Sequence, residues 1–468
     1  NFKYEYGFRS HSMHRRLVRW SPFISTAIRP REKVVIDLFL RREWVAQPKG
    51  IPMLDFSEER KRFGESCTAC GRCVVVCPII PETDVRDIEP AAVMESVMAL
   101  YHSGTMSPTA KTRIYSCMSC QTCKNQCPEG MDPSLGLSLA RAILQEKGEP
   151  TPRGLSFLLP ETDFNLMKAI EAIQLKPEER PWVTDVIRQK PSSSKTVLFT
   201  GCTGIMQPDL VSTALDLIRR VDASAQALGG IDYCCGDTNL RAGNSAASAS
   251  HFLRLVEGLE SFSPKNVVFL CSTCNFFFDL HAPKTTWSWQ VITQFLVDNL
   301  DKLGPLKELN ATITIHDACH LVRGEKPEFE SPRTLAKAIP GIKVVEMENC
   351  AENALCCGGS AMAAVGKPGT DFRTRRLKQA VDTGAQIMAL YCPGCQSVFA
   401  PERPNLPIQI ESLITLLGRS AGICHEDKLF RFLSYRDGKR VLSEAEECVQ
   451  ASELPKEKLM GFITKYFK

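Results

Sequence analysis

The chain has 468 residues, more than one ordinary domain needs, so its length predicts two to four domains. Hydrophobic residues make up 44% and charged residues 24%, which is typical of a globular protein and not of a disordered one. A formal net charge of +4 does not favour a nucleic-acid binder. Neither a membrane span nor a signal peptide is expected, because no apolar run approaches roughly 18 residues and the first 30 residues lack an apolar centre.

The N-terminal residues 1–62 differ in charge from the rest of the chain. They carry 14 Lys and Arg against 7 Asp and Glu, whereas the other 406 residues carry 43 against 46. Aromatic residues such as Trp20 and Trp44 lie among the basic ones, and four prolines interrupt any long amphipathic helix. This pattern favours a basic arm that docks onto a partner subunit; a membrane-surface segment and a solvated arm are the alternatives.

Cysteine is the unusual component of this sequence. An odd count of 21, without a secretion signal, argues against a disulfide framework and for thiolates that bind metal. Two runs share the spacing C-x2-C-x2-C-x3-C-P, namely Cys67, Cys70, Cys73 and Cys77, and Cys117, Cys120, Cys123 and Cys127. Four thiolates so closely spaced predict a cubane [4Fe-4S] cluster for each run. Two zinc sites are the alternative, although zinc ribbons usually separate their C-x2-C pairs more widely.

The two runs predict one dicluster domain. In ferredoxins with two clusters the fourth cysteine of each run binds the other cluster. Cluster one is therefore assigned to Cys67, Cys70, Cys73 and Cys127, and cluster two to Cys117, Cys120, Cys123 and Cys77. The 39 residues between the runs contain apolar side chains at helical spacing over residues 88–102, which predicts a helical insertion.

A second cysteine pattern occurs twice. The first copy is Cys202, Cys234, Cys235, Cys271 and Cys274, and the second is Cys319, Cys356, Cys357, Cys392 and Cys395. Equivalent cysteines lie 117 to 122 positions apart, which indicates an internal duplication of about 120 residues. Five cysteines in each copy are one more than a cubane needs.

Short apolar segments precede most of these cysteines. Strands are predicted at residues 196–200, 267–270, 313–315 and 387–391. Helices are predicted between them at residues 209–221 and 372–383. Strand–loop–helix alternation predicts an α/β fold for each repeat, with the cysteines in loops at the carboxyl edge of its sheet.

The two sets of five cysteines resemble the CCG (cysteine-rich) domain of the heterodisulfide reductase B subunit. The dicluster part is similar to the C subunit, and a fusion in this order, over about residues 65–425, resembles the D subunit of the membrane-linked enzyme. The resemblance implies that each set holds a noncubane [4Fe-4S] cluster and that a disulfide substrate binds between the two clusters. Because both sets are complete, it favours two-electron chemistry on a disulfide or thiol pair.

The resemblance also implies roles and partners. The ten cysteines of the two sets are expected to be catalytic, and the eight of the two runs to carry electrons. A flavoprotein or a membrane cytochrome subunit is expected to supply the electrons, since the chain lacks a G-x-G-x-x-G motif for a nucleotide or flavin. The expected location is the cytoplasm, with peripheral contact to the inner face of the membrane through such a partner.

An electron-transfer subunit without its own substrate is the alternative function. Subunits of lactate, glycolate or glycerol-3-phosphate oxidation systems, and of sulfate-reducer membrane complexes, resemble this layout. An open, basic-lined cavity between the two sets would favour the enzyme, and colourless, zinc-containing protein would exclude both redox functions.

Several further residues lie near the predicted ligands. His316 and His320 are interpreted as hydrogen-bonding residues, with proton donation as the alternative. Arg241 and Arg323 are interpreted as structural, with recognition of a substrate carboxylate or phosphate as the alternative. Three cysteines fit no ligand position and are expected to be ordinary thiols: Cys350, Cys424 and Cys448.

These observations divide the chain into six segments. They are a basic docking arm (1–62), a mainly α-helical dicluster ferredoxin domain (63–150), a linker rich in proline and charge (151–194), the first CCG repeat (195–305), the second CCG repeat (306–425), and a charged, helix-prone tail (426–468). The predicted fold class is therefore α/β for the two repeats, preceded by a helical domain.

Overall fold

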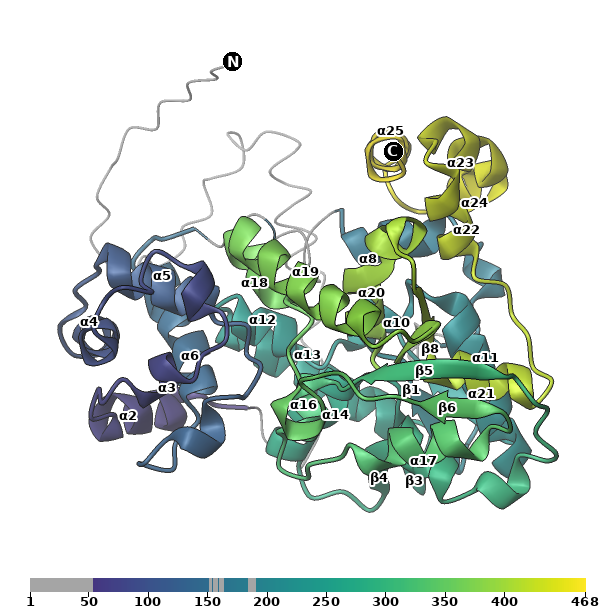
Figure 1. The fold of residues 1–468 in the computed structure, drawn as a ribbon, viewed down its shortest axis with the longest axis horizontal. Coiled ribbons are helices and arrows are strands. Elements are labelled where there is room, and N and C mark those ends of the chain that lie inside the picture. Colours follow the sequence, from purple (N-terminus) through teal and green to yellow (C-terminus); the bar gives the residue numbers. More distant parts are fainter. Residues whose placement is uncertain (1–53, 151–153, 155–158, 160–163, 184–190) are drawn as a thin grey trace, which may run out of the picture. The chain divides into compact units, whose positions relative to one another are not determined.

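The computed structural model describes residues 54–150, 154, 159, 164–183 and 191–468 (Figure 1). Residues 1–53 of the predicted docking arm lie outside these ranges, so its role stays a prediction. The described end of that segment is helical, because α2 (Ser57–Ser66) crosses the predicted boundary at residue 62. Its Phe63 is buried in the core of the following domain, so this helix is part of the dicluster domain.

The dicluster domain is helical, as predicted. Its elements after α2 are α3 (Arg72–Val75), η1 (Ile80–Glu82), α4 (Pro90–Ser103), α5 (Pro108–Ser116), η2 (Lys124–Gln126) and α6 (Pro133–Glu146). The three longest of these begin with proline, whose fixed φ and missing N–H suit the first position of a helix. Helix α4 confirms the helical insertion between the cysteine runs. Its buried Val93 and Val97 face the core shared with Leu137 of α6.

Part of the predicted linker is packed against the repeats. It contains α8 (Leu166–Ala172) and η3 (Pro177–Glu179), and Met167 and Ile170 of α8 are buried. Val183 forms a parallel bridge with Leu228 of the first repeat. The described part of this segment is therefore not a free tether, because its apolar residues need a surface to cover them.

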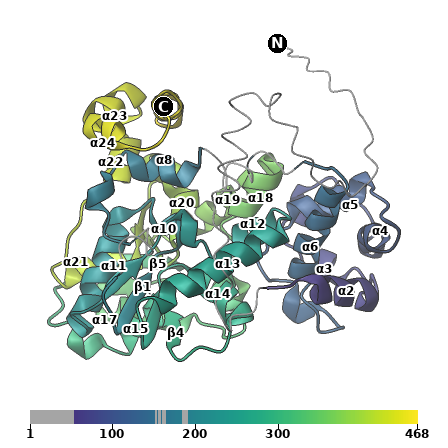
Figure 2. The ribbon, with the colours of Figure 1, turned by 180° about the vertical axis from the view of Figure 1, so that it is seen from behind.

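Each repeat contains a four-stranded parallel sheet with the same strand order (Figures 1 and 2). The first sheet has the order β2-β1-β3-β4, from β1 (Thr196–Phe199), β2 (Gln226–Leu228), β3 (Asn266–Phe269) and β4 (Ser288–Val291). The second has the order β6-β5-β7-β8, from β5 (Ala311–His316), β6 (Ile342–Val344), β7 (Ile387–Leu390) and β8 (Gln409–Ser412). This equivalence confirms both the duplication and the predicted fold class.

Helices follow the strands in both repeats. The first repeat contains α10 (Gly201–Gly204), α11 (Pro208–Val221), η4 (Ile231–Tyr233), α12 (Asp237–Arg241), α13 (Ser245–Glu260), α14 (Ser272–His281), α15 (Ile292–Val297) and η5 (Leu300–Lys302). The second contains α16 (Cys319–Val322), α17 (Glu330–Ala338), η6 (Ala351–Asn353), α18 (Gly359–Val365), α19 (Lys367–Asp382), α20 (Pro393–Phe399), η7 (Ala400–Asn405) and α21 (Leu413–Ser420). Short helices thus begin at or close to the cysteines that follow the central strands.

The C-terminal tail forms four helices, in agreement with its predicted helical tendency. They are α22 (Lys428–Tyr435), α23 (Gly438–Glu444), α24 (Glu446–Ala451) and α25 (Lys456–Tyr466). Phe432 of α22 and Phe467 bring the two ends of this tail together, with ring centroids 6.2 Å apart. Lys428 donates a 2.9 Å hydrogen bond to the carbonyl of Gln174, which attaches the tail to the segment between the domains.

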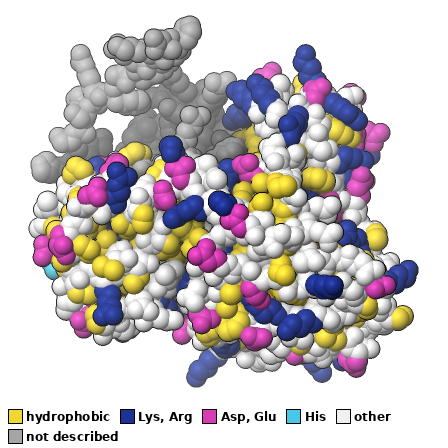
Figure 3. All heavy atoms as spheres, in the orientation of Figure 1, with side chains coloured by type: hydrophobic (Ala, Val, Ile, Leu, Met, Phe, Trp, Pro, Cys, Tyr) yellow, Lys and Arg dark blue, Asp and Glu magenta, His cyan; other side chains and the backbone are white. Residues whose placement is uncertain are grey.

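The described surface carries mixed charge. On the face drawn in Figure 3, acidic and basic side chains are interspersed and neither gathers into one large patch. Among the helices in the described ranges, none is both long and apolar enough to span a bilayer.

Candidate functional site

Four cysteines from both runs meet around one cavity of the dicluster domain. Cys67, Cys70, Cys73 and Cys127 all line this cavity. Burial raises the pKa of the Cys67 thiol, and the nearby thiols of Cys127 and Cys70 raise it further. The structure therefore places Cys127 with the first three cysteines of the other run, which is the arrangement that cross-ligation of cluster one requires.

A buried arginine lies beside the thiols that are predicted to bind cluster two. Arg113 of α5 donates a 3.7 Å hydrogen bond to Cys77 Sγ and a 3.3 Å hydrogen bond to the carbonyl of Cys73. Burial alone would lower its pKa, but the surrounding thiols, first Cys77 and then Cys117, hold the pKa above its ordinary value. The guanidinium thus stays positive where cluster two would bring negative charge. Sequence reasoning missed Arg113, because no spacing or motif distinguishes it from other arginines.

The two sets of five cysteines lie at equivalent places in the two repeats. The thiols of Cys202 and Cys234 are 3.7 Å apart, and those of Cys319 and Cys356 are 3.8 Å apart. Nine of these ten cysteines are buried, and Cys319 is half-buried. Sequence positions separated by more than a hundred residues thus reproduce one geometry.

Glycines after the cysteine pairs bring backbone N–H groups to sulfur. Gly236 N–H donates to Cys234 Sγ at 3.5 Å, and Gly358 N–H donates to Cys356 Sγ at 3.4 Å. Both glycines have left-handed φ angles, +94° and +81°, which other residues seldom adopt. Such N–H groups stabilise negative charge on a ligating sulfur, so both repeats have the same N–H···S hydrogen bond at their cysteine pair.

The two sets face each other. The Cys392 thiol lies close enough to Cys271 to raise the pKa of its thiol, against the opposing effect of Cys274. Gln207 adds contacts across the repeats, since its amide donates to the carbonyl of Pro393 at 3.0 Å. Of five cavities in the described ranges, none is lined by cysteines of both sets. The structure thus brings the sets together, and an open, basic-lined cavity between them is not among these five.

Both histidines near the second set are engaged by protein groups. His316 is fully buried, accepts a 3.0 Å hydrogen bond from Arg376 Nε, and has its pKa lowered to about 3 by burial. His320 donates from Nε2 to the carbonyl of Ser119 at 2.6 Å, and Arg241 donates to Nδ1 of its ring at 3.3 Å. These partners agree with the interpretation that both histidines are hydrogen-bonding residues.

The donor groups fit four-iron clusters. Eight thiols in two groups of four suit two cubanes, and five thiols in each repeat suit a cluster with an additional cysteine ligand. In the described ranges, no three His, Cys, Asp or Glu side chains have the geometry that would hold a single metal ion. Cys350, Cys424 and Cys448 lie outside the predicted ligand groups, and their assignment as ordinary thiols stays a prediction.

Comparison with known proteins identifies the same units. Residues 64–131 match a 4Fe-4S dicluster domain, and residues 196–279 and 313–400 each match a cysteine-rich domain. The chain is 28% identical over 403 residues to the D subunit of dihydromethanophenazine:CoB–CoM heterodisulfide reductase from Methanosarcina acetivorans, covering 77% of this chain and 95% of that protein.

More distant relatives have other functions. The B subunit of the fumarate reductase (CoM/CoB) from Methanothermobacter marburgensis is 25% identical over 358 residues, which cover 73% of this chain and 68% of that protein. The EtfAB:quinone oxidoreductase of Syntrophomonas wolfei is 22% identical over 392 residues, which cover 72% of this chain and 54% of that protein. The relatives are oxidoreductases or their subunits, and they differ in the substrates that their names give.

Proposed function

We propose that the chain is the catalytic iron–sulfur subunit of a heterodisulfide-reductase-like complex, on the basis of its 4Fe-4S dicluster domain, its two cysteine-rich domains and its similarity to the D subunit of that enzyme. Electrons enter from a partner, cross the dicluster domain and reach the two five-cysteine sets. There, two electrons and two protons convert one disulfide into two thiols. In the reverse direction, oxidation of two thiols to a disulfide releases two electrons and two protons.

One observation carries this proposal. Both repeats keep all five cysteines, and the sets face each other through Cys271 and Cys392. A chain that only relays electrons would need four ligands for each cluster, and the fifth would have no task. Two one-electron centres side by side supply the two electrons that a disulfide requires.

The residues of the chain have definable tasks in this reaction. When bound, the clusters supply one-electron carriers. Gly236 and Gly358 donate their N–H groups to ligand sulfur, and Arg113 provides a buried positive charge beside Cys77. Burial of the thiols excludes water, which protects iron–sulfur bonds and strengthens these interactions.

The experiment that tests the proposal is anoxic purification followed by metal analysis and disulfide turnover. The expected result is brown protein with about 16 irons per chain and no stoichiometric zinc. A low-potential dye should drive reduction of a disulfide substrate. Cys235→Ser and Cys357→Ser should each abolish this turnover while the cubanes remain reducible. If iron-edge diffraction finds ordinary cubanes with four cysteines in both repeats, the catalytic proposal fails.

A second candidate is an electron-transfer subunit without its own substrate. The observation that favours it is the burial of nine of the ten thiols of the two sets, which leaves a substrate little access to them. Under this candidate, all clusters are reducible and electrons pass between two partner proteins, but no disulfide is turned over in the presence of either partner. The same preparation therefore distinguishes the two candidates.

A further inference from the structure

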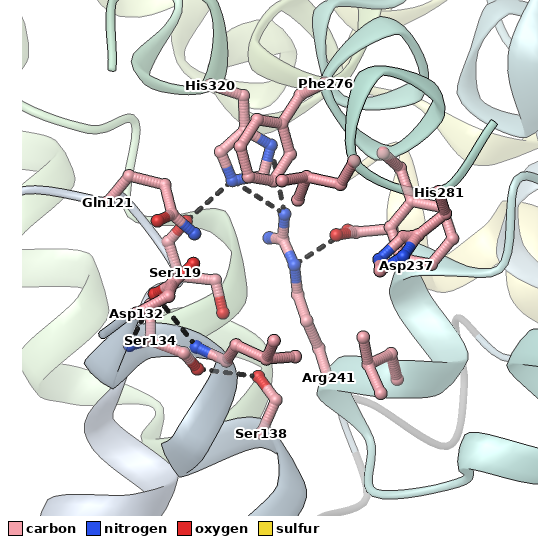
Figure 4. A pocket seen from close by; sticks show the side chains of 14 residues that line it. Ser119, Gln121, Asp132, Ser134, Ser138, Asp237, Arg241, Phe276, His281 and His320 are labelled. Atoms are coloured by element: carbon pink, nitrogen blue, oxygen red, sulfur yellow. Dashed lines mark hydrogen bonds and ion pairs between the residues drawn. The ribbon is translucent and has the colours of Figure 1, made fainter. Parts of the chain in front are cut away.

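Three parts of the chain meet beside the loop of the second cysteine run (Figure 4). Ser119 comes from that loop, Arg241 from α12 of the first repeat, and His320 from α16 of the second repeat. Arg241 points toward the ring of His320, which bonds to the carbonyl of Ser119 (Figure 4). Arg241 also forms a 2.7 Å ion pair with Asp237, so its own position is fixed. The loop of cluster two is thereby attached to both repeats.

Arg323 makes the direct connection from this loop to the second set. Its guanidinium donates to the carbonyl of Cys120 at 2.8 Å, to that of Glu352 at 2.7 Å, and to that of Ala354. The two latter carbonyls lie just before the paired cysteines Cys356 and Cys357. One buried side chain, on a residue with 6% of its surface exposed, therefore joins a predicted ligand of cluster two to the loop that presents the second set.

The thiols of these two loops are neighbours. The buried thiol of Cys120 lies close enough to that of Cys356 for the two to interact electrostatically. Cys319 of the second set interacts electrostatically with Cys120 as well. The first set approaches the second through Cys271 and Cys392. These contacts form a series from cluster two to the second set and then to the first.

The first repeat is also attached to the loop of cluster two, by a different arginine. Arg141 of α6 donates to the carbonyl of Cys117 at 2.7 Å and to that of Arg241. Arg141 thus connects the loop of cluster two to α12 of the first repeat, which carries no cysteine. Arg323 instead connects the loop to the residues directly before Cys356 and Cys357. Electron transfer slows steeply with distance, so the approach of Cys356 to Cys120 favours the second set as the path.

We propose that electrons enter the two repeats through the second cysteine set, and that Arg323 is the positioning residue that holds the loop of Cys120 against the loop before Cys356. The proposal rests on the proposed function only in taking the cysteine sets as cluster ligands. It holds equally for an enzyme and for an electron-transfer subunit. In this step, one electron passes from the cluster that Cys77, Cys117, Cys120 and Cys123 would hold to the cluster that the second set would hold. No bond is made or broken.

Arginine suits this task for a physical reason. Its planar group has five N–H donors, so it can bond to three carbonyls in fixed directions, while lysine would offer a single point charge. Replacing it would leave the carbonyls of Cys120, Glu352 and Ala354 without these donors in a buried place. The two loops would then separate or move, and the rate of the step would report this movement.

The order of the two sets is tested with an equivalent pair of variants. Cys235→Ser alters the first set, and Cys357→Ser alters the corresponding cysteine of the second. After mixing with dithionite and rapid freezing, electron paramagnetic resonance follows the arrival of electrons at the intact set. In Cys235→Ser, the second set should be reduced at the wild-type rate. In Cys357→Ser, reduction of the first set should slow by about tenfold or more. Equal rates in the two variants, or the reverse order, would overturn the assigned entry.

The positioning role is tested with Arg323→Met and Arg323→Lys. Both should leave reduction of the dicluster domain unchanged and slow arrival at the second set, by about tenfold for methionine and less for lysine. Amide hydrogen exchange should rise at residues 117–123 and 352–358 in the same variants. If methionine prevents folding, the lysine variant alone still tests both readouts.

Arg220→Met is the matched control. Arg220 also joins two backbone carbonyls, those of Leu303 and Ala421, and both lie away from the cysteine sets in the sequence. Its removal should leave the electron-transfer rate and the exchange at residues 117–123 at wild-type values. Arg323 variants with the wild-type rate, whether or not exchange rises, would overturn the positioning role. Since no disulfide is present in these measurements, failure of disulfide turnover would count against the proposed function and not against this inference.

Discussion

Cys77 closes the first cysteine run, yet its thiol accepts a hydrogen bond from a buried arginine that faces the second run. Arg113 donates to Cys77 Sγ, and the thiols of Cys117, Cys73 and Cys123 also raise the pKa of this arginine, which therefore lies between thiols of both runs. Cys77 lies near Cys123 as well, since its charge is one of those that raise the pKa of the Cys123 thiol, after burial. The contacts of a single residue thus support the assignment of ligands to two clusters.

This arrangement predicts different damage from two equivalent substitutions. Cys77→Ser should weaken or convert the cluster held by Cys117, Cys120 and Cys123, because a hydroxyl is a poorer iron ligand than a thiolate. Cys127→Ser should instead affect the cluster of the first run. Electron paramagnetic resonance of the reduced protein separates the two signals. Damage by Cys77→Ser that is confined to the cluster of its own run would contradict cross-ligation.

The enclosed ring of His281 makes the free energy of unfolding depend on pH. Its ring lies among aromatic side chains, with centroids 4.6 Å from Phe277 and 5.5 Å from Phe56. Burial lowers the pKa of His281 from 6.5 to about 4, and the charge of Asp237 opposes this only weakly. Between these values the unfolded chain binds a proton that the folded chain does not. The free energy of unfolding should therefore fall as the pH drops from about 6.5 toward 4.

The contribution of His281 is measurable by substitution. His281→Phe keeps an aromatic ring and removes the titration, so it should remove up to about 3 kcal/mol of the loss in unfolding free energy over this range. Denaturation at several pH values, under anoxic conditions, measures the difference from wild type. His102→Gln, at an exposed position, is the control and should retain the wild-type pH dependence. An unchanged slope in His281→Phe would refute the assignment.

At the residue scale, spacing was sufficient to select the cysteines but not their supporting residues. The predicted ligand cysteines follow fixed local spacings that can be read in any one sequence. Arg113 and Arg323 have no such signal, because they reach Cys77 and Cys120 across 36 and 203 positions in the chain. A buried arginine resembles a surface arginine until the fold places carbonyls and thiols around it.

Among the elements, α3 depends on one glycine. Gly71 begins this helix with a φ of +74°, and a Cβ there would lie 2.4 Å from the carbonyl carbon of Pro90 at the start of α4. This close approach brings the loop of cluster one against the helical insertion. Only a residue without a side chain allows both the left-handed backbone and the contact.

Two glycine substitutions separate these two requirements. Gly71→Ala should lower the free energy of unfolding by about 3 kcal/mol and reduce the iron content, since strain and overlap act together. Gly130→Ala, with a φ of +62° and nothing within 4 Å of the added Cβ, should cost only about 1 kcal/mol. Denaturant titration and iron analysis of both variants provide the comparison. Equal losses would show that the contact with Pro90 has no energetic role.

The central strands of each sheet could be predicted from the sequence, and the edge strands could not. The central strands β1, β3, β5 and β7 were predicted, because residues buried on both faces form continuous apolar segments. The edge strands β2, β4, β6 and β8 were not predicted. They have three or four residues each and include polar residues such as Gln226 and Lys343, so they show no apolar run. Their pairing becomes visible only when the neighbouring strand is in place.

For the whole molecule, the duplication allowed one repeat to support the interpretation of the other. Ten cysteines at matched intervals predicted two equivalent sheets, and both sheets have the same strand order. How the repeats meet the dicluster domain could not be predicted from the sequence. That contact depends on single long-range bonds, such as those of Arg323 and His320, which no periodicity reveals.

The first residues that the structure describes are firmly attached to the folded part. Phe56 has 6% of its surface exposed and lies against His281. Arg60 of α2 forms two hydrogen bonds with Glu146 of α6, at 2.6 and 2.9 Å. Folding should therefore need the chain from about residue 54 onward, and residues 1–53 can be removed without taking any of these contacts.

Removing residues 1–53 separates a docking role from a folding role. The shortened protein should keep its clusters and an unfolding free energy within about 1 kcal/mol of wild type, because Phe56 and α2 remain. If the basic segment docks onto a partner, the flavoprotein or cytochrome subunit that accompanies the full chain should be lost on anoxic purification. Phe56→Ala in the full chain is the converse control, since it should reduce stability but retain the partner. A shortened protein that keeps its partner would show that docking resides in residues after 53.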